Sequence, residues 1–194
     1  KHILLSGTET VLLKDAGNRI LAQDIIATFP MPSFDNSAMD GFAVRAVDTK
    51  GTDQSLPVTL KMVGVSSAGS PGDITLGPGE CAQCMTGAII PNGADAIAMV
   101  EDTSGFSDTD SVQIFQEAKI GKHIRKKGEE IQDGDVLIPK GAHITPNEIG
   151  TLATFGYGEI SVAQKPRIAI FGTGDELVEP GIELKLGQIY NSNL

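Results

Sequence analysis

Short strand-like segments dominate residues 19–138, and this constrains the fold more than any other feature. Each segment is rich in branched or small apolar residues and is bounded by Gly, Pro, Asp or Ser. With 23 Gly and 10 Pro, the chain has enough turn residues to close such strands into a barrel-like module or a sandwich. The predicted strands are 19–26, 57–65, 80–85, 94–100, 112–115 and 135–138.

One helix is predicted after these strands. Thr145 is typical of an N-cap, Pro146 suits the first helical position, and Glu148 completes a capping box with the threonine. Apolar residues recur at helical spacing over 149–155, and Gly156 is expected to end the helix. The middle of the chain is therefore a β module followed by a short helix.

The pattern changes after a strand predicted at 159–163 and the boundary at Lys165-Pro166. Residues 167–171 form a continuous apolar run, which is typical of a parallel strand buried on both faces. The glycine-rich, acidic turn at 172–177 follows it, in the place where open α/β sheets bind ligands, although a lone Gly-x-Gly is more often structural. One strand and one loop cannot form an α/β layer, so residues 166–194 are expected to begin a domain that continues further.

Residues 34–44 place acids, an amide and a hydroxyl where a simple core strand would be apolar. The run is Phe-Asp-Asn-Ser-Ala-Met-Asp-Gly-Phe-Ala-Val, and its two carboxylates, its amide and its hydroxyl fall within the six residues 35–40. Gly41 allows a close backbone approach or a sharp turn. Two interpretations stay open on these residues alone: a ligand site, or polar residues that cap a turn or a short helix.

The net charge of −10 disfavours broad binding to nucleic acid or to an anionic membrane. No apolar run approaches the roughly 20 residues of a membrane-spanning helix, and no secretion signal is evident, so a cytoplasmic protein is expected. A local exception to the acidic character lies at residues 119–127, which include Lys119, Lys122, His123, Arg125, Lys126 and Lys127. This segment is either an anion site or a solvated basic loop.

Cys81 and Cys84 have the two-residue spacing of redox and zinc motifs. A zinc site needs further ligands, and no second Cys or His pair has a suitable spacing. The pair also falls within a predicted strand rather than between a strand and a helix. The thiols are therefore interpreted as small apolar core residues.

Four segments, in this order, resemble the molybdopterin molybdenumtransferases, which are the MoeA proteins and the E domain of gephyrin. The most specific are the Asn-Ser-Ala-Met-Asp-Gly run at 36–41 and the Thr-Gly-Asp-Glu-Leu turn at 173–177. The resemblance covers nearly all of the chain. Its segments are 34–44, 85–88 with 91–95, 125–130, and 173–177 with 187–190.

The resemblance implies a mixed α/β, multi-domain fold in an elongated homodimer. Residues 8–26 and 135–165 would form an elongated α+β first domain, and residues 27–134 a β-rich inserted lid domain. Residues 166–194 would begin a truncated α/β, MogA-like domain that binds molybdopterin. In such a homodimer the lid of one subunit faces the α/β domain of the other.

The resemblance also implies an enzyme of molybdenum cofactor biosynthesis. Its reaction consumes adenylylated molybdopterin and molybdate, releases AMP and requires Mg²⁺, which fits the chemistry of phosphoanhydride cleavage. A MogA-like molybdopterin adenylyltransferase would be the upstream partner. The 194-residue piece alone is expected to be inactive, because much of the pterin pocket would lie in further sequence.

The resemblance assigns site residues position by position. Asp40 and Glu176 match important acids and are the proposed metal ligands; Thr86 is expected to form hydrogen bonds rather than attack as a nucleophile. The catalytic set is Asp40, Glu176, Glu130 and Thr86, and the substrate-binding set is Asp35, Asn36, Ser37, Arg125, Gly174 and Asp175. Arg125 would hold phosphate or molybdate oxygens through its planar guanidinium.

One position departs from the family pattern. Glu130 stands where the family usually has Asp, so its carboxylate is one methylene further from the backbone. The competing interpretations are therefore a non-catalytic dimerising scaffold module and an inactive homologue of the same fold. Preference for molybdenum over tungsten does not follow from the sequence, because the two oxyanions have the same charge and nearly the same size.

Overall fold

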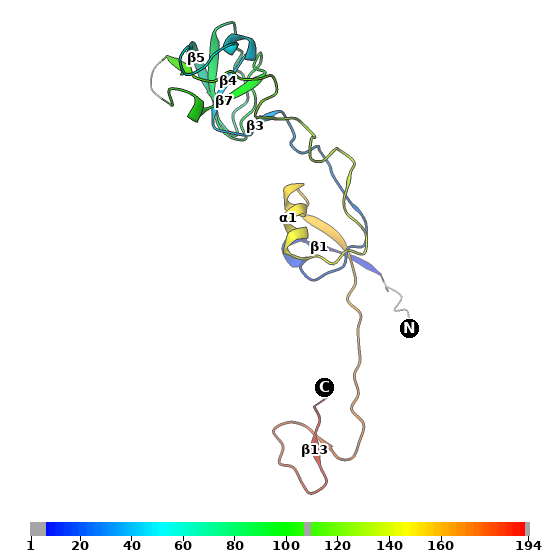
Figure 1. Ribbon diagram of the computed structural model, residues 1–194. Helices are drawn as coiled ribbons and strands as arrows, with labels where there is room; N and C mark the ends of the chain where they lie inside the picture. The colour runs from blue at the N-terminus through cyan, green and yellow to red at the C-terminus, as the bar shows by residue number, and fades with distance from the viewer. Residues whose placement is uncertain (1–6, 107–109, 193–194) are drawn as a thin grey trace. The chain divides into compact units, whose positions relative to one another are not determined.

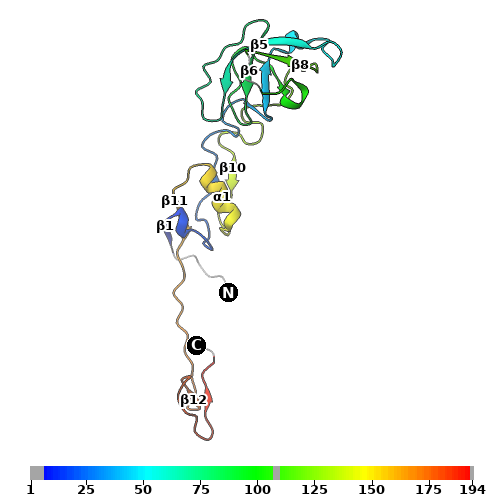
Figure 2. The ribbon, with the colours of Figure 1, turned by 90° about the vertical axis from the view of Figure 1, so that its left-hand side faces the viewer.

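The computed structural model describes residues 7–106 and 110–192. The chain divides into two compact units, here called the β unit (residues 24–139) and the helical unit (residues 7–23 and 140–192). Each is described by itself, and Figures 1 and 2 label their elements.

A curled five-stranded sheet forms most of the β unit. Its strand order is β7-β4-β6-β5-β8, with β5 and β6 parallel and the other neighbours antiparallel. After β7, the short 3-10 helix η3 (Val100–Asp102) brings the chain to the far edge strand, where Ser104 N donates to Gln113 O at 2.9 Å. This contact closes the sheet into a barrel-like curl. The strands are β4 (Gly41–Val44), β5 (Val58–Ser66), β6 (Glu80–Cys84), β7 (Ala96–Met99) and β8 (Ser111–Ile114).

Both faces of this sheet are covered, which explains why β4 is buried at every position. Phe42, Leu60 and Cys81 belong to one apolar cluster, whereas Ala43 and Cys84 belong to a second cluster. Because alternate residues of a strand point to opposite faces, β4 and β6 contribute to both clusters. The two cysteines are free and buried, and burial raises the pKa of Cys81 to about 12 and that of Cys84 to about 11.

Short ribbons complete the β unit. β3 (Asn36–Ser37) pairs antiparallel with β9 (Ile124–Arg125), and β2 (Ile25–Ile26) pairs with β10 (Val136–Ile138). The 3-10 helix η2 (Ala46–Thr49) follows β4. These ribbons join segments from opposite ends of the unit, so residues 34–37 lie beside residues 124–127.

The helical unit contains β1 (Thr8–Leu12) paired antiparallel with β11 (Glu159–Ala163). Between them lie η1 (Leu13–Asp15) and the helix α1 (Pro146–Thr154), which has the predicted capping box. Buried Arg19 forms an ion pair with Glu9 of β1 and donates to Ala163 O of β11 at 2.8 Å. The predicted helix is confirmed at both ends. The capping box of Thr145 and Glu148 begins it, and Gly156 takes the left-handed conformation with φ of 77° just after it.

The apolar run at 167–171 does not form the predicted strand. No strand is assigned there, and Ile168, Ile170 and Phe171 are 76%, 63% and 84% exposed. A buried parallel strand needs paired neighbours and cover on both faces, and the described residues supply neither. Further along, β12 (Leu177–Val178) and β13 (Ile189–Tyr190) form a two-stranded parallel ribbon.

Most other predicted strands are confirmed within one or two residues. Those at 57–65, 80–85, 94–100, 112–115, 135–138 and 159–163 correspond to β5, β6, β7, β8, β10 and β11. The segment 19–26 is strand only at β2, with isolated bridges at Ile20 and Leu21. The division into three domains stays a prediction. Within the described residues, no helix combines the length and apolar character needed to span a bilayer.

The position of Gly41 gives a test of the packing between β4 and β7. A Cβ at this residue would lie 2.0 Å from the Ala98 carbonyl oxygen, so Gly41→Ala must push the two strands apart. We expect a loss of at least about 2 kcal/mol in the free energy of unfolding, measured by urea denaturation followed by circular dichroism. Gly150→Ala is the control: its Cβ would meet nothing within 4 Å, and alanine in helix α1 should stabilise by about 0.5–1 kcal/mol.

The opposed burial of the two thiols predicts an unreactive pair. Cys81 and Cys84 lie in different clusters and have raised pKa values, so neither thiolate is available to a thiol reagent or to zinc. We expect no reaction with Ellman's reagent in the native protein and reaction of both thiols in denaturant. Stoichiometric zinc in the purified protein would contradict this interpretation.

Candidate functional site

The turn before β4 is built to present Asp40. Ser37 is fully buried, and its hydroxyl donates to Met39 O at 2.5 Å, which fixes the turn between β3 and β4. Val100 N donates to Asp40 O at 3.1 Å, while Gly41 leaves room for the close approach of β7. The Asp40 backbone is therefore fixed, and Asp40 stands exposed at the start of the inner strand β4.

The side-chain carboxylate of Asp40 is held by one residue, Thr86. The Thr86 backbone N and its Oγ1 both donate to Asp40 Oδ1, each at 2.7 Å. These bonds, the backbone bond first, hold the pKa of Asp40 below its usual value. Among the described residues, Oδ2 receives no hydrogen bond. Asp40 is therefore an ionised carboxylate with one oxygen fixed and the other available to a ligand.

Thr86 is itself fixed by a tight turn after β6. Ala88 N donates to Met85 O at 2.9 Å, and Gly87 takes the left-handed conformation with φ of 79°. Gly87 N donates to Ser37 O at 2.8 Å, which connects the turn to β3. Two segments 46 residues apart in the sequence thus meet at one carboxylate.

Asp40 lies at the edge of a hollow of about 460 Å³. Most of the residues that line it are apolar, and two of them are exposed: Met39 at 42% and Phe106 at 43%. The Phe106 ring packs on buried Phe42 with ring centroids 5.5 Å apart. The lining residues are Met39, Asp40, Thr86, Met99, Val100, Glu101 and Phe106.

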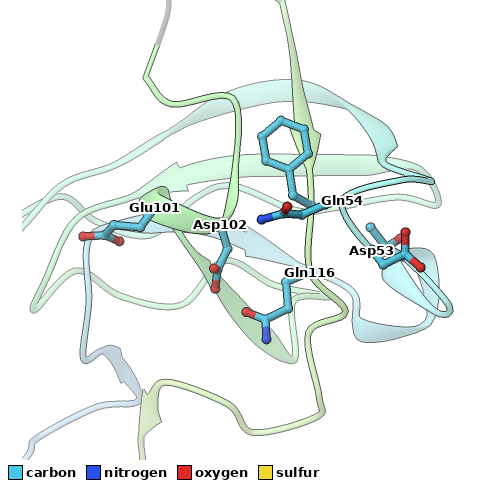
Figure 3. A pocket seen from close by; sticks show the side chains of 7 residues that line it. Asp53, Gln54, Glu101, Asp102 and Gln116 are labelled. Atoms are coloured by element: carbon cyan, nitrogen blue, oxygen red, sulfur yellow. The ribbon is translucent and has the colours of Figure 1, made fainter.

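A second hollow of about 340 Å³ carries more acids but is a weaker candidate (Figure 3). Asp53 Oδ1 already accepts from Ser55 N, Ser55 Oγ and Leu56 N. With its amide nitrogen toward Asp102, Gln116 donates to both oxygens of that carboxylate at 2.7 and 3.1 Å. In Figure 3 the Glu101 side chain points away from the other acids. The carboxylates of this hollow do not converge on a common point.

The basic segment lies beside the polar run, through the pairing of β3 with β9. Asp35 is occupied by this segment: Lys126 Nζ and Lys127 N each donate to its carboxylate at 2.8 Å. The Lys126 hydrogen bond is the main cause of the lowered pKa of Asp35. The predicted binding residue Asp35 thus has an internal partner, which supports a structural role in joining the two segments.

Arg125 differs from Lys126 in its lack of an acidic partner. It is half-buried, Asn36 is its cross-strand partner, and its one side-chain hydrogen bond among the described residues goes to Ser37 O at 3.3 Å. Its Nε is buried without a partner, as are Asn36 Oδ1 and His123 Nε2. A half-buried guanidinium without a carboxylate has the charge and the free donors to bind an anion.

Glu130 belongs to the β unit, whereas the 172–177 turn belongs to the helical unit. Glu130 is exposed, and its backbone N donates to Met31 O at 3.0 Å. In the helical unit, the Glu176 carboxylate folds over Gly174, where a Cβ would lie 2.5 Å from its oxygens. The φ of 150° at Gly174 favours glycine, and Gly174, Asp175 and Glu176 form one compact acidic turn that is closed by Leu177 N donating to Gly174 O at 3.1 Å.

The structure gathers Asp40 and Thr86 at one point, and Asn36, Ser37 and Arg125 at the neighbouring ribbon. Sequence reasoning missed part of the lining of the hollow: the apolar Met99 and Phe106, and the acidic Glu101. Met99 lies near the end of the strand predicted at 94–100 and Glu101 follows it directly, so their place at that end was a usable signal. Phe106 carried none, because a single Phe in a polar stretch has no diagnostic spacing. Among the described residues, no group of three or more His, Cys, Asp or Glu could hold a metal ion.

The hydrogen bonds from Thr86 predict the behaviour of Asp40. In Thr86→Val the hydroxyl donor is lost and the backbone donor stays, so the pKa of Asp40 should rise toward that of an ordinary aspartate but not reach it. The measurement is a titration of the Asp40 side-chain carboxyl by ¹³C NMR. Thr154→Val is the control, since that hydroxyl bonds only to Gly150 O within helix α1. An unchanged Asp40 pKa in Thr86→Val would contradict the contact.

Comparison with known proteins finds relatives over most of the chain. Residues 1–156 match the sequence model described as the MoeA N-terminal region (domain I and II). The chain is 42% identical over 188 residues to the molybdopterin molybdenumtransferase of Bacillus subtilis, covering 96% of this chain and 44% of the relative. It is 44% identical over 184 residues to molybdopterin molybdenumtransferase 2 of Mycobacterium tuberculosis, covering 95% of this chain and 45% of the relative.

Solved structures give the same result. Two crystal structures of a molybdopterin biosynthesis MoeA protein from Pyrococcus horikoshii match with TM-scores of 0.82 and 0.89 and identities of 38% and 33%. Each match covers 96% of this chain and 47% or 49% of the other. The chain thus spans less than half the length of these relatives. It belongs to the MoeA family, of which it carries the N-terminal region.

Proposed function

We propose that this chain is part of a molybdopterin molybdenumtransferase, a transferase of molybdenum cofactor biosynthesis. The reaction would transfer molybdenum from molybdate to the dithiolene of adenylylated molybdopterin and release AMP. The observation that carries the proposal is the Asp40 carboxylate, ionised and fixed through Oδ1 by Thr86 at the edge of an open hollow. The names of the relatives support the substrate class.

The residues present fit a Mg²⁺ ion that has few protein ligands. Asp40 offers one free carboxylate oxygen, and the described residues contain no cluster of three metal ligands. Mg²⁺ retains waters and commonly binds one or two carboxylates together with substrate phosphates, so this sparse donor set suits it. When bound, Mg²⁺ would neutralise the negative charge that builds up as the phosphoanhydride is cleaved. Asp40 is the proposed ligand in the β unit.

Thr86 acts on Asp40 and not on the substrate in this proposal. Its hydroxyl proton is donated to Asp40 Oδ1, which is a carboxylate with a lowered pKa and hence a weak base. Such a carboxylate does not activate a hydroxyl for attack. Thr86 therefore positions the carboxylate and keeps it ionised.

Arg125 is the proposed anion ligand. Its guanidinium lacks a carboxylate partner among the described residues, where its one side-chain hydrogen bond goes to the neutral Ser37 carbonyl. A planar guanidinium can bind two oxygens of phosphate or molybdate at once. The basic segment would then supply the local positive charge that an anionic substrate needs on a chain of net charge −10.

The remaining assignments are proposals of the same standing. Glu176 is proposed as a second metal ligand, with Gly174 and Asp175 shaping its turn, and Glu130 as a further acid of the reaction. Asn36 and Ser37 support Arg125 and the Asp40 turn. We further propose a cytoplasmic homodimer that receives its substrate from a MogA-like adenylyltransferase.

Complementation tests this function. A full-length gene that contains this chain should restore molybdoenzyme activity to a bacterial strain lacking its own molybdenum insertion enzyme, and Asp40→Asn should fail, because it removes the proposed charge. Asp53→Asn is the matched control, since that carboxylate also accepts N–H and O–H bonds but caps a turn away from the site. Molybdenum cofactor content is measured directly in cell extracts.

Two outcomes would count against the proposal. Rescue by both variants would remove Asp40 from the mechanism. Failure of the unmodified gene, with the protein present and folded, would favour the scaffold or inactive-homologue interpretation instead.

A further inference from the structure

We propose that the hollow beside Asp40 binds the flat, amino-substituted heterocycle of the substrate, which is either the pterin or the adenine ring. This inference rests on the proposed function and deepens it by naming the part of the substrate that the β unit recognises. Three apolar side chains from different segments, Met39, Met99 and Phe106, form the binding surface.

The apolar lining packs on the core of the β unit on one side and is exposed to solvent on the other. Phe106 packs against Phe42, which is 1% exposed and belongs to the core, yet Phe106 itself remains 43% exposed. Met39 is 42% exposed at the same hollow. Exposed large apolar residues that gather around a hollow mark a binding surface, whereas isolated ones need no explanation. A flat ring would cover these side chains and remove their apolar area from water.

Methionine and phenylalanine suit a flat ring in particular. A thioether is polarisable and unbranched, so Met39 and Met99 can adapt to the face of a heterocycle. The Phe106 ring can stack on it in an offset or edge-to-face arrangement. The volume of about 460 Å³ lies within the range of small-molecule sites, in which apolar walls carry a few convergent polar groups.

The polar residues of the hollow select the substituents of the ring. Glu101 is exposed, has no hydrogen bond or ion pair among the described residues, and extends away from Asp102 and Gln116 in Figure 3. Glu101 follows Val100, whose N–H donates to Asp40 O, so the backbones of Glu101 and Asp40 are close in space. A carboxylate accepts hydrogen bonds from an exocyclic amino group, which pterin and adenine both carry, and pterin offers a ring N–H in addition.

The placement of Asp40 at the same hollow joins the two parts of the substrate. A ring bound on the methionines and Phe106 would keep its attached phosphate groups near the Asp40 carboxylate. The acidic lining also explains why a bare anion does not suit this hollow: Asp40 and Glu101 would repel it unless a ring anchors the molecule. The chemistry recognised is therefore a heterocycle first and its charge second.

The test uses ¹³C-methyl methionine NMR on the 194-residue chain, which has five methionines. The ligands are AMP, 6-hydroxymethylpterin and inorganic phosphate, each added with Mg²⁺. We expect ring-current shifts of the Met39 and Met99 methyl signals with AMP, with the pterin, or with both, and the stronger ligand identifies the ring. Met31 and Met62 lie outside the hollow and should not move, and phosphate should shift neither Met39 nor Met99.

Variants test the apolar contact of Phe106 and the polar contact of Glu101 separately. Phe106→Ala should weaken ring binding about tenfold, whereas Phe34→Ala, which removes a phenylalanine that is 41% exposed elsewhere in the β unit, should not. Glu101→Leu removes the acceptor oxygens and should abolish the preference for AMP over the purine riboside monophosphate that lacks the amino group. Retained Met31 and Met62 chemical shifts in the free variants show that the fold of the β unit is intact.

Several results would overturn the inference. These are no shift of Met39 and Met99 with either ring, equal shifts with inorganic phosphate, or equal weakening by Phe106→Ala and Phe34→Ala. The outcome is independent of complementation. If the full-length gene rescues, Asp40→Asn fails, and no ring shifts the methionines, the proposed function stands and this inference is wrong.

Discussion

The close approach of β4 to β7 at Gly41 is the constraint on which the site depends. No side chain larger than hydrogen fits there, since a Cβ would lie 2.0 Å from the Ala98 carbonyl oxygen. The approach brings the end of β7 beside the start of β4, so Val100 N can bond to Asp40 O. It therefore places Met99, Val100 and Glu101 around the same hollow as Asp40. One missing methyl group thus determines which residues meet at the carboxylate.

The sequence predicted the regular parts of this fold well because their causes are local. The helix α1 follows from Thr145, Pro146 and Glu148, which satisfy the free N–H groups of its first turn whatever surrounds them. The strands β5, β6 and β8 follow from short apolar segments between turn residues. The apolar run at 167–171 failed as a strand for the opposite reason: a parallel strand needs neighbours, and its own residues cannot provide them.

The candidate site was predicted in part, and the part that was missed is tertiary. Residues 34–44 stood out through their composition, but composition could not show which of their polar side chains have partners inside the fold. Asp35 and Ser37 hold neighbouring segments together, whereas Asp40 keeps a free oxygen. Spacing along the chain could not separate these roles, because Thr86 and Lys126 are 46 and 91 residues away from the acids they contact. Only the closure of the sheet shows which acid is already paired.

The comparison of Asp35 with Asp40 explains why the second is the better ligand. Both have a pKa below the usual value, so both are charged at neutral pH. Asp35 is paired with the Lys126 ammonium, which compensates its charge. Asp40 is held only by the neutral N–H and O–H of Thr86, which fix its position and leave its negative charge without a counter-ion among the described residues. A carboxylate that is positioned but not neutralised attracts a cation, whereas a neutralised one stabilises the fold.

The same distinction applies with opposite sign to Lys126 and Arg125: the lysine is paired, and the arginine keeps a free charge for an anion. The polar ribbon and the turn after β6 therefore carry one charge of each sign that has no partner of opposite charge among the described residues, which fits the proposed substrate with its phosphate and metal ion.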